Sequence, residues 1–142
     1  MRDLSTLGFT QIREVCELSV LTGEQQFKLP DDYLIFLSYE PPEDLNLSFK
    51  FIESTTSQEW EGQVIEFLHY TASDINQAVV AVPDNPERIL LPISVDAGGN
   101  YSYMDLTSAS KQIIDVGYET GAISFLAETF GDFIDMLQVE DE

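Results

Sequence analysis

The fold of this protein is organised around residues 90–106, which read LLPISVDAGGNYSYMDL. The first part is an apolar run that ends at Val95, and residues 101–106 then alternate between two faces, as a half-buried strand does. Between them, residues 96–100 favour a turn, because glycine and asparagine adopt positive φ at little energetic cost. The stretch therefore predicts a β-hairpin, and we expect this hairpin in the middle of a sheet.

Two helices are expected in the first third of the chain. Thr10 is suited to cap the first, whose apolar side chains recur at three- and four-residue spacing up to Val20 before Gly23 ends it. Pro30 can begin the second helix, because its ring fixes φ and the two acidic residues after it suit the helix dipole. The prolines at 41–42 stop this helix, since they cannot donate backbone hydrogen bonds.

The middle of the chain carries strand patterns broken by polar segments. Residues 47–52 alternate as a half-buried strand, whereas residues 53–62 are polar and turn-rich. Residues 64–70 indicate a further strand whose register is left open. Ser73 is expected to cap a short helix over residues 74–82, with a strand over 79–82 as the alternative.

The order of these elements predicts one α+β domain over residues 1–142. Residues 113–118 add a strand after the hairpin, and Thr129 with Asp132 has the spacing of a capping box before a closing helix. Most strand connections are too short for parallel crossovers. We therefore expect a mainly antiparallel central sheet of about five to six strands. Helices near the N-terminus, one short internal helix and the closing helix should cover one face of it.

The composition limits the possible partners. The chain has 26 acidic and 6 basic residues in 142, a formal net charge of −20, which repels nucleic acid and anionic membranes and favours a basic protein partner. The alternative is that the charge serves solubility. Cys16 is the only cysteine, so no internal disulfide can form. The first residues lack the long apolar core of a signal peptide, and no apolar run is long enough to span a bilayer, so we expect neither a leader nor a membrane span. The expected location is the cytoplasm.

Catalysis and metal binding find little support in the residue types. His69 is the only histidine, and no nucleophile motif accompanies it. One cysteine and one histidine exclude the usual zinc ligand sets, and residues 96–100 lack the alternating acids of a calcium loop and the lysine of a phosphate loop. We expect a non-enzymatic protein without cofactor or metal. An enzyme acting through paired carboxylates is the alternative.

Aromatic side chains ringed by acids are typical of protein interfaces, and Trp60 stands between Glu59 and Glu61. The alternative for Trp60 is that it folds back onto the core. We predict partner contacts from acidic or aromatic residues expected in loops, namely Glu40, Glu43, Asp44, Glu59, Trp60, Glu61 and Asp96.

Several segments together resemble the SUKH superfamily. Residues 29–37, LPDDYLIFL, resemble the opening LP-x-x-Y-x-x-F-L motif of the superfamily. Residues 91–106 look like its central hairpin, and residues 113–118 are similar to the strand that follows. Residues 127–134, AETFGDFI, resemble its closing helix. The order and spacing match over residues 10–138.

The superfamily includes fungal cell-wall synthesis regulators and bacterial toxin-immunity proteins. The resemblance implies an α+β fold and a protein-binding role without catalysis. Our leading hypothesis is a cytoplasmic immunity protein, acting as a monomer or weak homodimer, that neutralises a cognate toxin such as a nuclease through its acidic surface. The alternative is an intracellular regulatory or scaffold protein, for example in cell-wall synthesis control.

Overall fold

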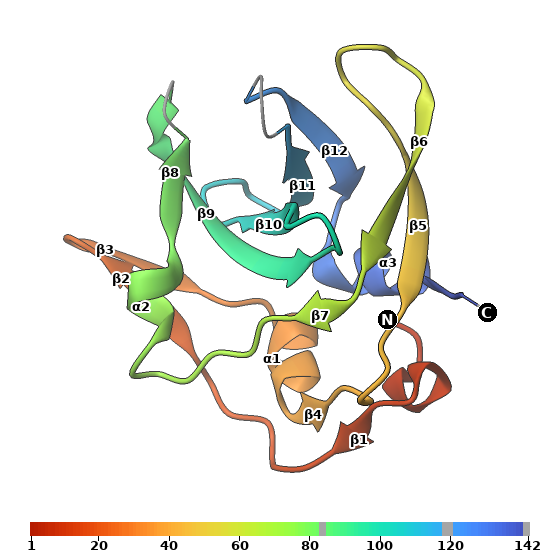
Figure 1. The fold of residues 1–142 in the computed structure, drawn as a ribbon. Coiled ribbons are helices and arrows are strands. Elements are labelled where there is room, and N and C mark those ends of the chain that lie inside the picture. Colours follow the sequence, from red (N-terminus) through yellow and green to blue (C-terminus); the bar gives the residue numbers. More distant parts are fainter. Residues whose placement is uncertain (83–84, 118–120, 141–142) are drawn as a thin grey trace.

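A curved antiparallel sheet forms the centre of the protein (Figure 1). The structure is a computed structural model that describes residues 1–82, 85–117 and 121–140. The sheet has the strand order β12-β11-β10-β9-β7, with β8 pairing on β9, and each of these pairs is antiparallel. This confirms the predicted α+β class and sheet. The six strands are β7 (Glu66–Phe67), β8 (Val80–Val82), β9 (Asn85–Val95), β10 (Tyr101–Asp105), β11 (Ile113–Val116) and β12 (Ile123–Ala127).

Smaller sheets extend this centre. A three-stranded sheet, β13-β5-β6, joins β5 (Leu47–Ile52) and β6 (Glu59–Val64) to β13 (Gln138–Val139) near the C-terminus. Two strand pairs lie toward the N-terminus: β1 (Thr10–Gln11) with β4 (Tyr39–Glu40), and β2 (Ser19–Thr22) with β3 (Gln25–Lys28).

The main core lies between the central sheet and two short helices. These are α1 (Asp31–Leu37) and α3 (Phe130–Asp135), and their apolar side chains belong to the largest buried cluster. The Phe36 ring lies 4.8 Å from the Phe67 ring and 4.9 Å from the Phe130 ring, both edge-on. Such edge-to-face contacts add to the stability that burial provides. The other helical elements are the 3-10 turn η1 (Leu4–Leu7) and α2 (Ile75–Ala78).

The predicted hairpin and closing helix are confirmed. Strands β9 and β10 pair at the centre of the sheet, with a register shift between Ser102 and Tyr103. Ile93, Met104 and Leu106 are buried in the core, whereas Val95 is half-buried. Thr129 Oγ1 accepts a 3.1 Å hydrogen bond from the backbone N–H of Asp132, which is the N-cap that the sequence predicts for α3.

The predicted helix between Thr10 and Gly23 is wrong. The segment instead forms β1, an extended stretch and β2. Its backbone makes hydrogen bonds to other segments rather than within a helix: the Ile12 N–H donates to the Ser38 carbonyl oxygen at 2.9 Å. The apolar side chains predicted to share one helix face are not buried together, since Ile12 is 50% exposed while Val20 is fully buried. A few apolar residues at helical spacing do not make a helix when each has a different partner.

Two strand boundaries in the middle of the chain also differ from expectation. Strand β6 begins at Glu59, inside the segment predicted as a polar loop. The expected strand over 64–70 is split, because β6 ends at Val64 and β7 covers only Glu66–Phe67.

Around α2, the alternative strand for 79–82 is the better prediction, since β8 begins at Val80. The N-cap of α2 is Asp74 rather than the predicted Ser73. Strand β11 ends at Val116, and the last residue of the expected strand, Tyr118, falls outside the described residues.

Within the described ranges, no helix has the length and apolar character needed to cross a membrane.

Candidate functional site

A groove of about 300 Å³ lies where the β5–β6 hairpin faces the central sheet. One wall comes from β5 and β6 and the other from the β9–β10 turn, β10 and β11. Its lining is aromatic and acidic. The groove is lined by Phe49, Phe51, Trp60, Glu61, Gly62, Gln63, Asp96, Asn100, Tyr101, Ser102, Asp115, Val116 and Gly117.

Close packing of the hairpin shapes the first wall. Phe49 and Gly62 are directly opposite each other across β5 and β6, and Phe49 is 5% exposed. A Cβ on Gly62 would lie 2.2–2.7 Å from atoms of the Phe49 ring, so the ring can rest on β6 only because residue 62 is glycine. On the other side the same ring packs edge-on against Phe133, with centroids 5.2 Å apart. The groove wall is therefore anchored to the main core.

The opposite wall begins at the turn of residues 96–100. The Asp96 carboxylate accepts hydrogen bonds from the backbone N–H groups of Gly98, at 2.8 Å, and Asn100, at 2.9 Å. Gly99 has a φ of 83°, a left-handed conformation that glycine adopts without strain. The Asp96 side chain thus stabilises its own turn, and it remains an acceptor on the groove lining.

The carboxylates near the groove influence one another. Burial, followed by the negative charges of Asp96 and Glu53, raises the pKa of Asp115 above its ordinary value. Hydrogen bonds from Thr55 and Thr56 lower the pKa of Glu53 to about 2, so this carboxylate stays ionised. The groove therefore concentrates negative charge around a partly buried carboxyl group, an arrangement that a bound cation would stabilise.

The structure divides the seven predicted contact residues into two groups. Trp60, Glu61 and Asp96 line the groove, and Glu59 precedes them on β6 with its carboxylate 3.9 Å from Lys50 Nζ. The other three do not join them. Glu40 ends β4, and Glu43 and Asp44 follow in an exposed turn at the end of the molecule that holds α1 (Figure 1).

The expectation that all seven lie in loops is wrong for four of them. Glu59, Trp60 and Glu61 belong to β6, and Glu40 belongs to β4. Trp60 does not fold back onto the core, since 50% of it is exposed. Its strand position holds it against β5, where it pairs with Phe51.

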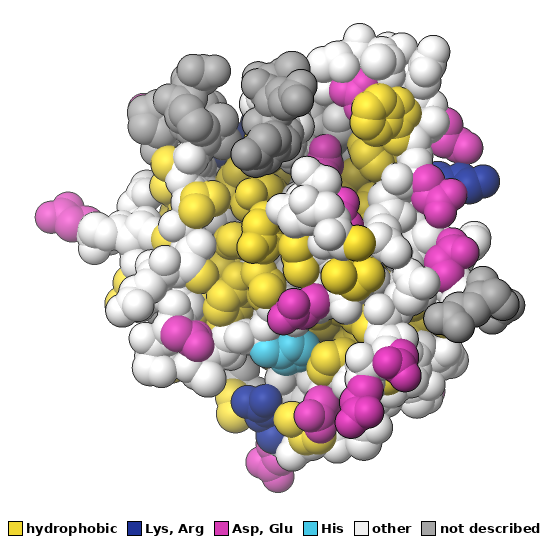
Figure 2. All heavy atoms as spheres, viewed as in Figure 1, with side chains coloured by type: hydrophobic (Ala, Val, Ile, Leu, Met, Phe, Trp, Pro, Cys, Tyr) yellow, Lys and Arg dark blue, Asp and Glu magenta, His cyan; other side chains and the backbone are white. Residues whose placement is uncertain are grey.

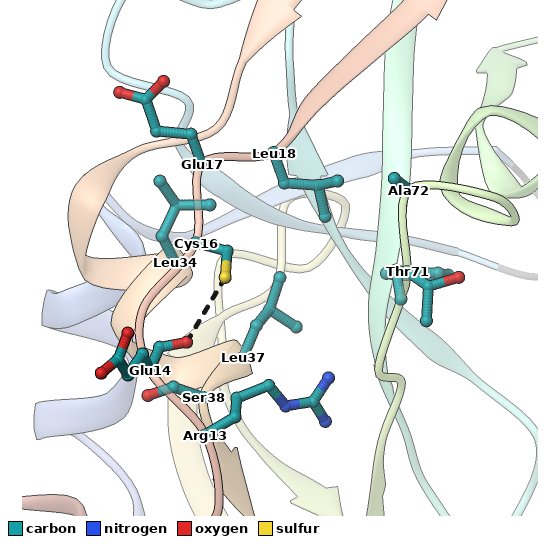
Figure 3. Close-up of a pocket in the computed structure, with 11 residues that line it drawn as sticks. Arg13, Glu14, Cys16, Glu17, Leu18, Leu34, Leu37, Ser38, Thr71 and Ala72 are labelled. Atoms are coloured by element: carbon teal, nitrogen blue, oxygen red, sulfur yellow. Dashed lines mark hydrogen bonds between the residues drawn. The ribbon is translucent and has the colours of Figure 1, made fainter.

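A second hollow of about 220 Å³ lies between residues 13–18, α1 and residues 70–72 (Figure 3). Leu34 and Leu37 of α1 form its apolar side, and the Arg13 side chain extends across it. The Cys16 thiol donates a 3.6 Å hydrogen bond to the Glu14 carbonyl. None of the predicted contact residues lines this hollow.

The only histidine has a structural environment. His69 Nε2 lies 2.9 Å from the Tyr39 carbonyl oxygen, and the ring stacks on Phe36 at 5.3 Å. Burial lowers the pKa of His69 below 6.5, which favours the neutral ring. Among the described residues, no group of three or more histidine, cysteine or acidic side chains is placed to hold a metal ion.

Most groove residues were not among the predicted contacts, and Asp115 and Tyr101 are the two that matter most for its chemistry. Asp115 interrupts the apolar strand β11, between Ile114 and Val116, and an acid in such a strand is the signal that could have identified it. Tyr101 stands out only as an aromatic residue on the returning strand of the hairpin. Its place beside the β5–β6 hairpin depends on packing between segments that are distant in sequence.

Comparison with known proteins gives a match to one family model. Searches of curated proteins and of solved structures gave no match to this chain. A sequence model of the SMI1 / KNR4 family (SUKH-1) matches residues 17–136, which include α1, the central sheet and α3. This range covers most of residues 10–138, where the motifs resemble the superfamily. The chain belongs to the SMI1 / KNR4 family (SUKH-1).

Proposed function

We propose that this protein is a non-catalytic binding protein that neutralises a cognate bacterial toxin in the cytoplasm. The toxin domain is basic, as nucleases are around their active sites. Family membership supports a binding or regulatory role, and the charge of −20 supports a basic partner.

The groove is the observation that carries this proposal. Its lining includes the half-exposed Trp60 together with Glu61 and Asp96, so an aromatic residue and two acidic residues contribute to one groove. Aromatic residues that lie in well-packed surroundings and are flanked by charges often dominate the energy of an interface. The basic side chains of a nuclease, which normally hold phosphates, could pair with these carboxylates.

The charge also makes a kinetic contribution. Long-range attraction between a strongly acidic protein and a basic partner raises the association rate, and salt screens this attraction within about 8 Å at physiological ionic strength. An inhibitor that must intercept a toxin before it acts benefits most from fast association. We therefore assign the broad acidic surface to steering and the groove to holding the partner.

Co-expression with the toxic product of a neighbouring gene tests the proposal. Cells should survive with the unaltered protein, and Trp60→Ala should weaken the purified complex by about 30-fold or more, as expected for a central aromatic contact. Ile52→Ala is the matched control, because Ile52 is 57% exposed on the neighbouring strand β5 and does not line the groove.

Three results would contradict parts of the proposal. If no neighbouring product is toxic, or toxicity persists in the presence of the protein, the immunity role is wrong and the regulatory or scaffold role takes its place. If Glu43→Gln weakens the complex while Trp60→Ala does not, the binding site lies at the other acidic group. If affinity does not change with salt, electrostatic steering is not involved.

A further inference from the structure

The central sheet has a second apolar face that is separate from the main core. Leu90 and Ile114 form a small buried cluster of their own, with Tyr103, Val116 and Ile123 packed against it. Directly paired residues on neighbouring strands point to the same face of a sheet. The pairs Tyr103–Ile114, Ile114–Phe125 and Val116–Ile123 therefore lie on one side of β10, β11 and β12. We call this side the open face.

The open face reaches from β8 to β12. Val80 pairs with Leu90 at one end and is 43% exposed, while Phe125 at the other end is 52% exposed. In Figure 2, apolar side chains gather over β9 and β10, between β8 and β11. The buried apolar side chains of α1, α2 and α3 all belong to the main core, so no helix in the described part of the chain packs on this face.

Two neighbouring tyrosines of β10 extend the open face toward the groove, and Tyr70 lies at the margin of the sheet. The Tyr101 and Tyr103 rings lie 6.2 Å apart, and Tyr101 also lines the groove, so the groove and the open face are continuous. The Tyr70 hydroxyl donates a 2.5 Å hydrogen bond to the Pro92 carbonyl. Burial and then the charge of nearby Asp74 raise the pKa of Tyr70, and Tyr101 contributes as well.

The margin of the open face is acidic. Glu66 and Asp74 line a shallow hollow beside Tyr70, and Figure 2 shows acidic side chains bordering the apolar area. Arg88 lies on this side, but it is already paired: its Nε donates a 2.8 Å hydrogen bond to the carboxylate of Asp105, which is 1% exposed. An apolar surface with an acidic margin is complementary to an apolar segment flanked by lysine or arginine.

We propose that the open face binds an amphipathic, cationic segment of the partner protein. The apolar side chains of this segment pack on Tyr103, Ile123 and Phe125, and its basic side chains reach Glu66 and Asp74. The identification of the partner as a basic protein rests on the proposed function, whereas the location of the site rests on the sheet alone. A second copy of this chain is a poor occupant, because two chains of charge −20 repel each other.

The test uses the full chain and synthetic peptides of about 18 residues, or about five helical turns. A leucine–lysine peptide with helical amphipathic spacing is titrated by calorimetry and should bind. An all-lysine peptide has the charge without the apolar face, and a leucine–glutamate peptide has the apolar face with the opposite charge. Both should bind at least about tenfold more weakly.

Variants then locate the site. Phe125→Ser should weaken binding of the leucine–lysine peptide by about tenfold or more, because a large apolar contact is lost. Leu21→Ser is the matched control, since Leu21 is 54% exposed on the separate β2–β3 hairpin and should leave binding unchanged. Both residues are exposed, so neither change should disturb folding, which circular dichroism checks.

Each other outcome overturns the inference. The open face is not the site if the peptide fails to bind the unaltered protein, or if it binds Phe125→Ser equally well. If the all-lysine peptide binds as tightly, charge alone explains binding. If sedimentation shows dimers that Phe125→Ser abolishes, a second copy occupies the face. Toxin neutralisation is not measured in this test, so failure here leaves the proposed function standing, and failure of neutralisation leaves this result intact.

Discussion

Substituting Gly62 tests how the hairpin wall of the groove is built. A Cβ at this position would lie 2.2, 2.5 and 2.7 Å from three atoms of the Phe49 ring. Carbon atoms in contact are normally separated by about 3.5–4.0 Å. In Gly62→Ala the ring must therefore move by roughly 1 Å or rotate away, although Phe49 is almost fully buried and packs against Phe133.

The expected loss of stability follows from this geometry. Extra atoms in a well-packed region cost about 1–3 kcal/mol, and relief of the clash here would also disturb the edge-on contact between Phe49 and Phe133. Alanine should recover some of this loss, because glycine is the more flexible residue in the unfolded chain. We expect Gly62→Ala to lower the free energy of unfolding by about 2 kcal/mol, or Tm by about 4–8 °C.

Thermal and urea unfolding of four proteins measure this effect: the unaltered chain, Gly62→Ala, Phe49→Ala and the double variant. If the clash is the cause, Gly62→Ala should cost little once Phe49 is alanine. Gly98→Ala is the control, because the nearest atom to its Cβ is the flexible Asn100 side-chain nitrogen at 3.3 Å. A loss of equal size in the Phe49→Ala background would refute the packing argument.

Three further substitutions probe buried or partly buried polar groups. The fold lowers the pKa of His69 below 6.5, so the stabilising contribution of the neutral ring is complete above pH 6.5. This contribution is lost as the pH falls from 6.5 through the lower pKa of the folded state. The difference in Tm between the unaltered chain and His69→Gln should therefore shrink over this range, and a constant difference would contradict the argument. The raised pKa of Asp115 means that its ionised form opposes folding at neutral pH. Asp115→Asn should therefore stabilise the free protein at pH 7 by less than about 1 kcal/mol after solvent screening, and the gain should vanish in acid. A lower Tm for Asp115→Asn at pH 7 would refute this. The buried Tyr33 hydroxyl has no hydrogen-bond partner among the described residues. Urea unfolding of Tyr33→Phe should therefore show unchanged stability or a gain of up to about 1–2 kcal/mol, and a clear loss would show that the hydroxyl is bonded.

Local sequence signals were sufficient where one segment specifies its own structure. The turn at residues 96–100 requires residues that accept its backbone angles, and the Asp96 carboxylate bonds within the same turn. Thr129 caps α3 through a residue three positions later. In both cases the interaction that decides the structure spans only a few residues, so it is visible in the sequence.

The sequence was insufficient where distant segments decide the outcome. Residues 10–22 have helical spacing, yet their backbone bonds to β4 and β3 and becomes extended. Strand β6 is polar, and it is a strand because β5 pairs with it over its whole length. The groove combines β6 with Asp96 and Asp115, so neither its position nor the role of Asp115 could be predicted before the two sheets were placed.

The electrostatics of the groove connect stability with binding. Asp115 is partly buried near the charges of Asp96 and Glu53, so ionising it costs free energy in the free protein. A lysine or arginine entering the groove would remove this cost, and the energy that weakens the free fold would then appear as affinity for the cation. Asp115→Asn should therefore have opposite effects on the two properties, raising the stability of the free protein while weakening the complex. A residue with only a structural role would change both in the same direction, which makes this pair of measurements informative about the site as well as about the fold.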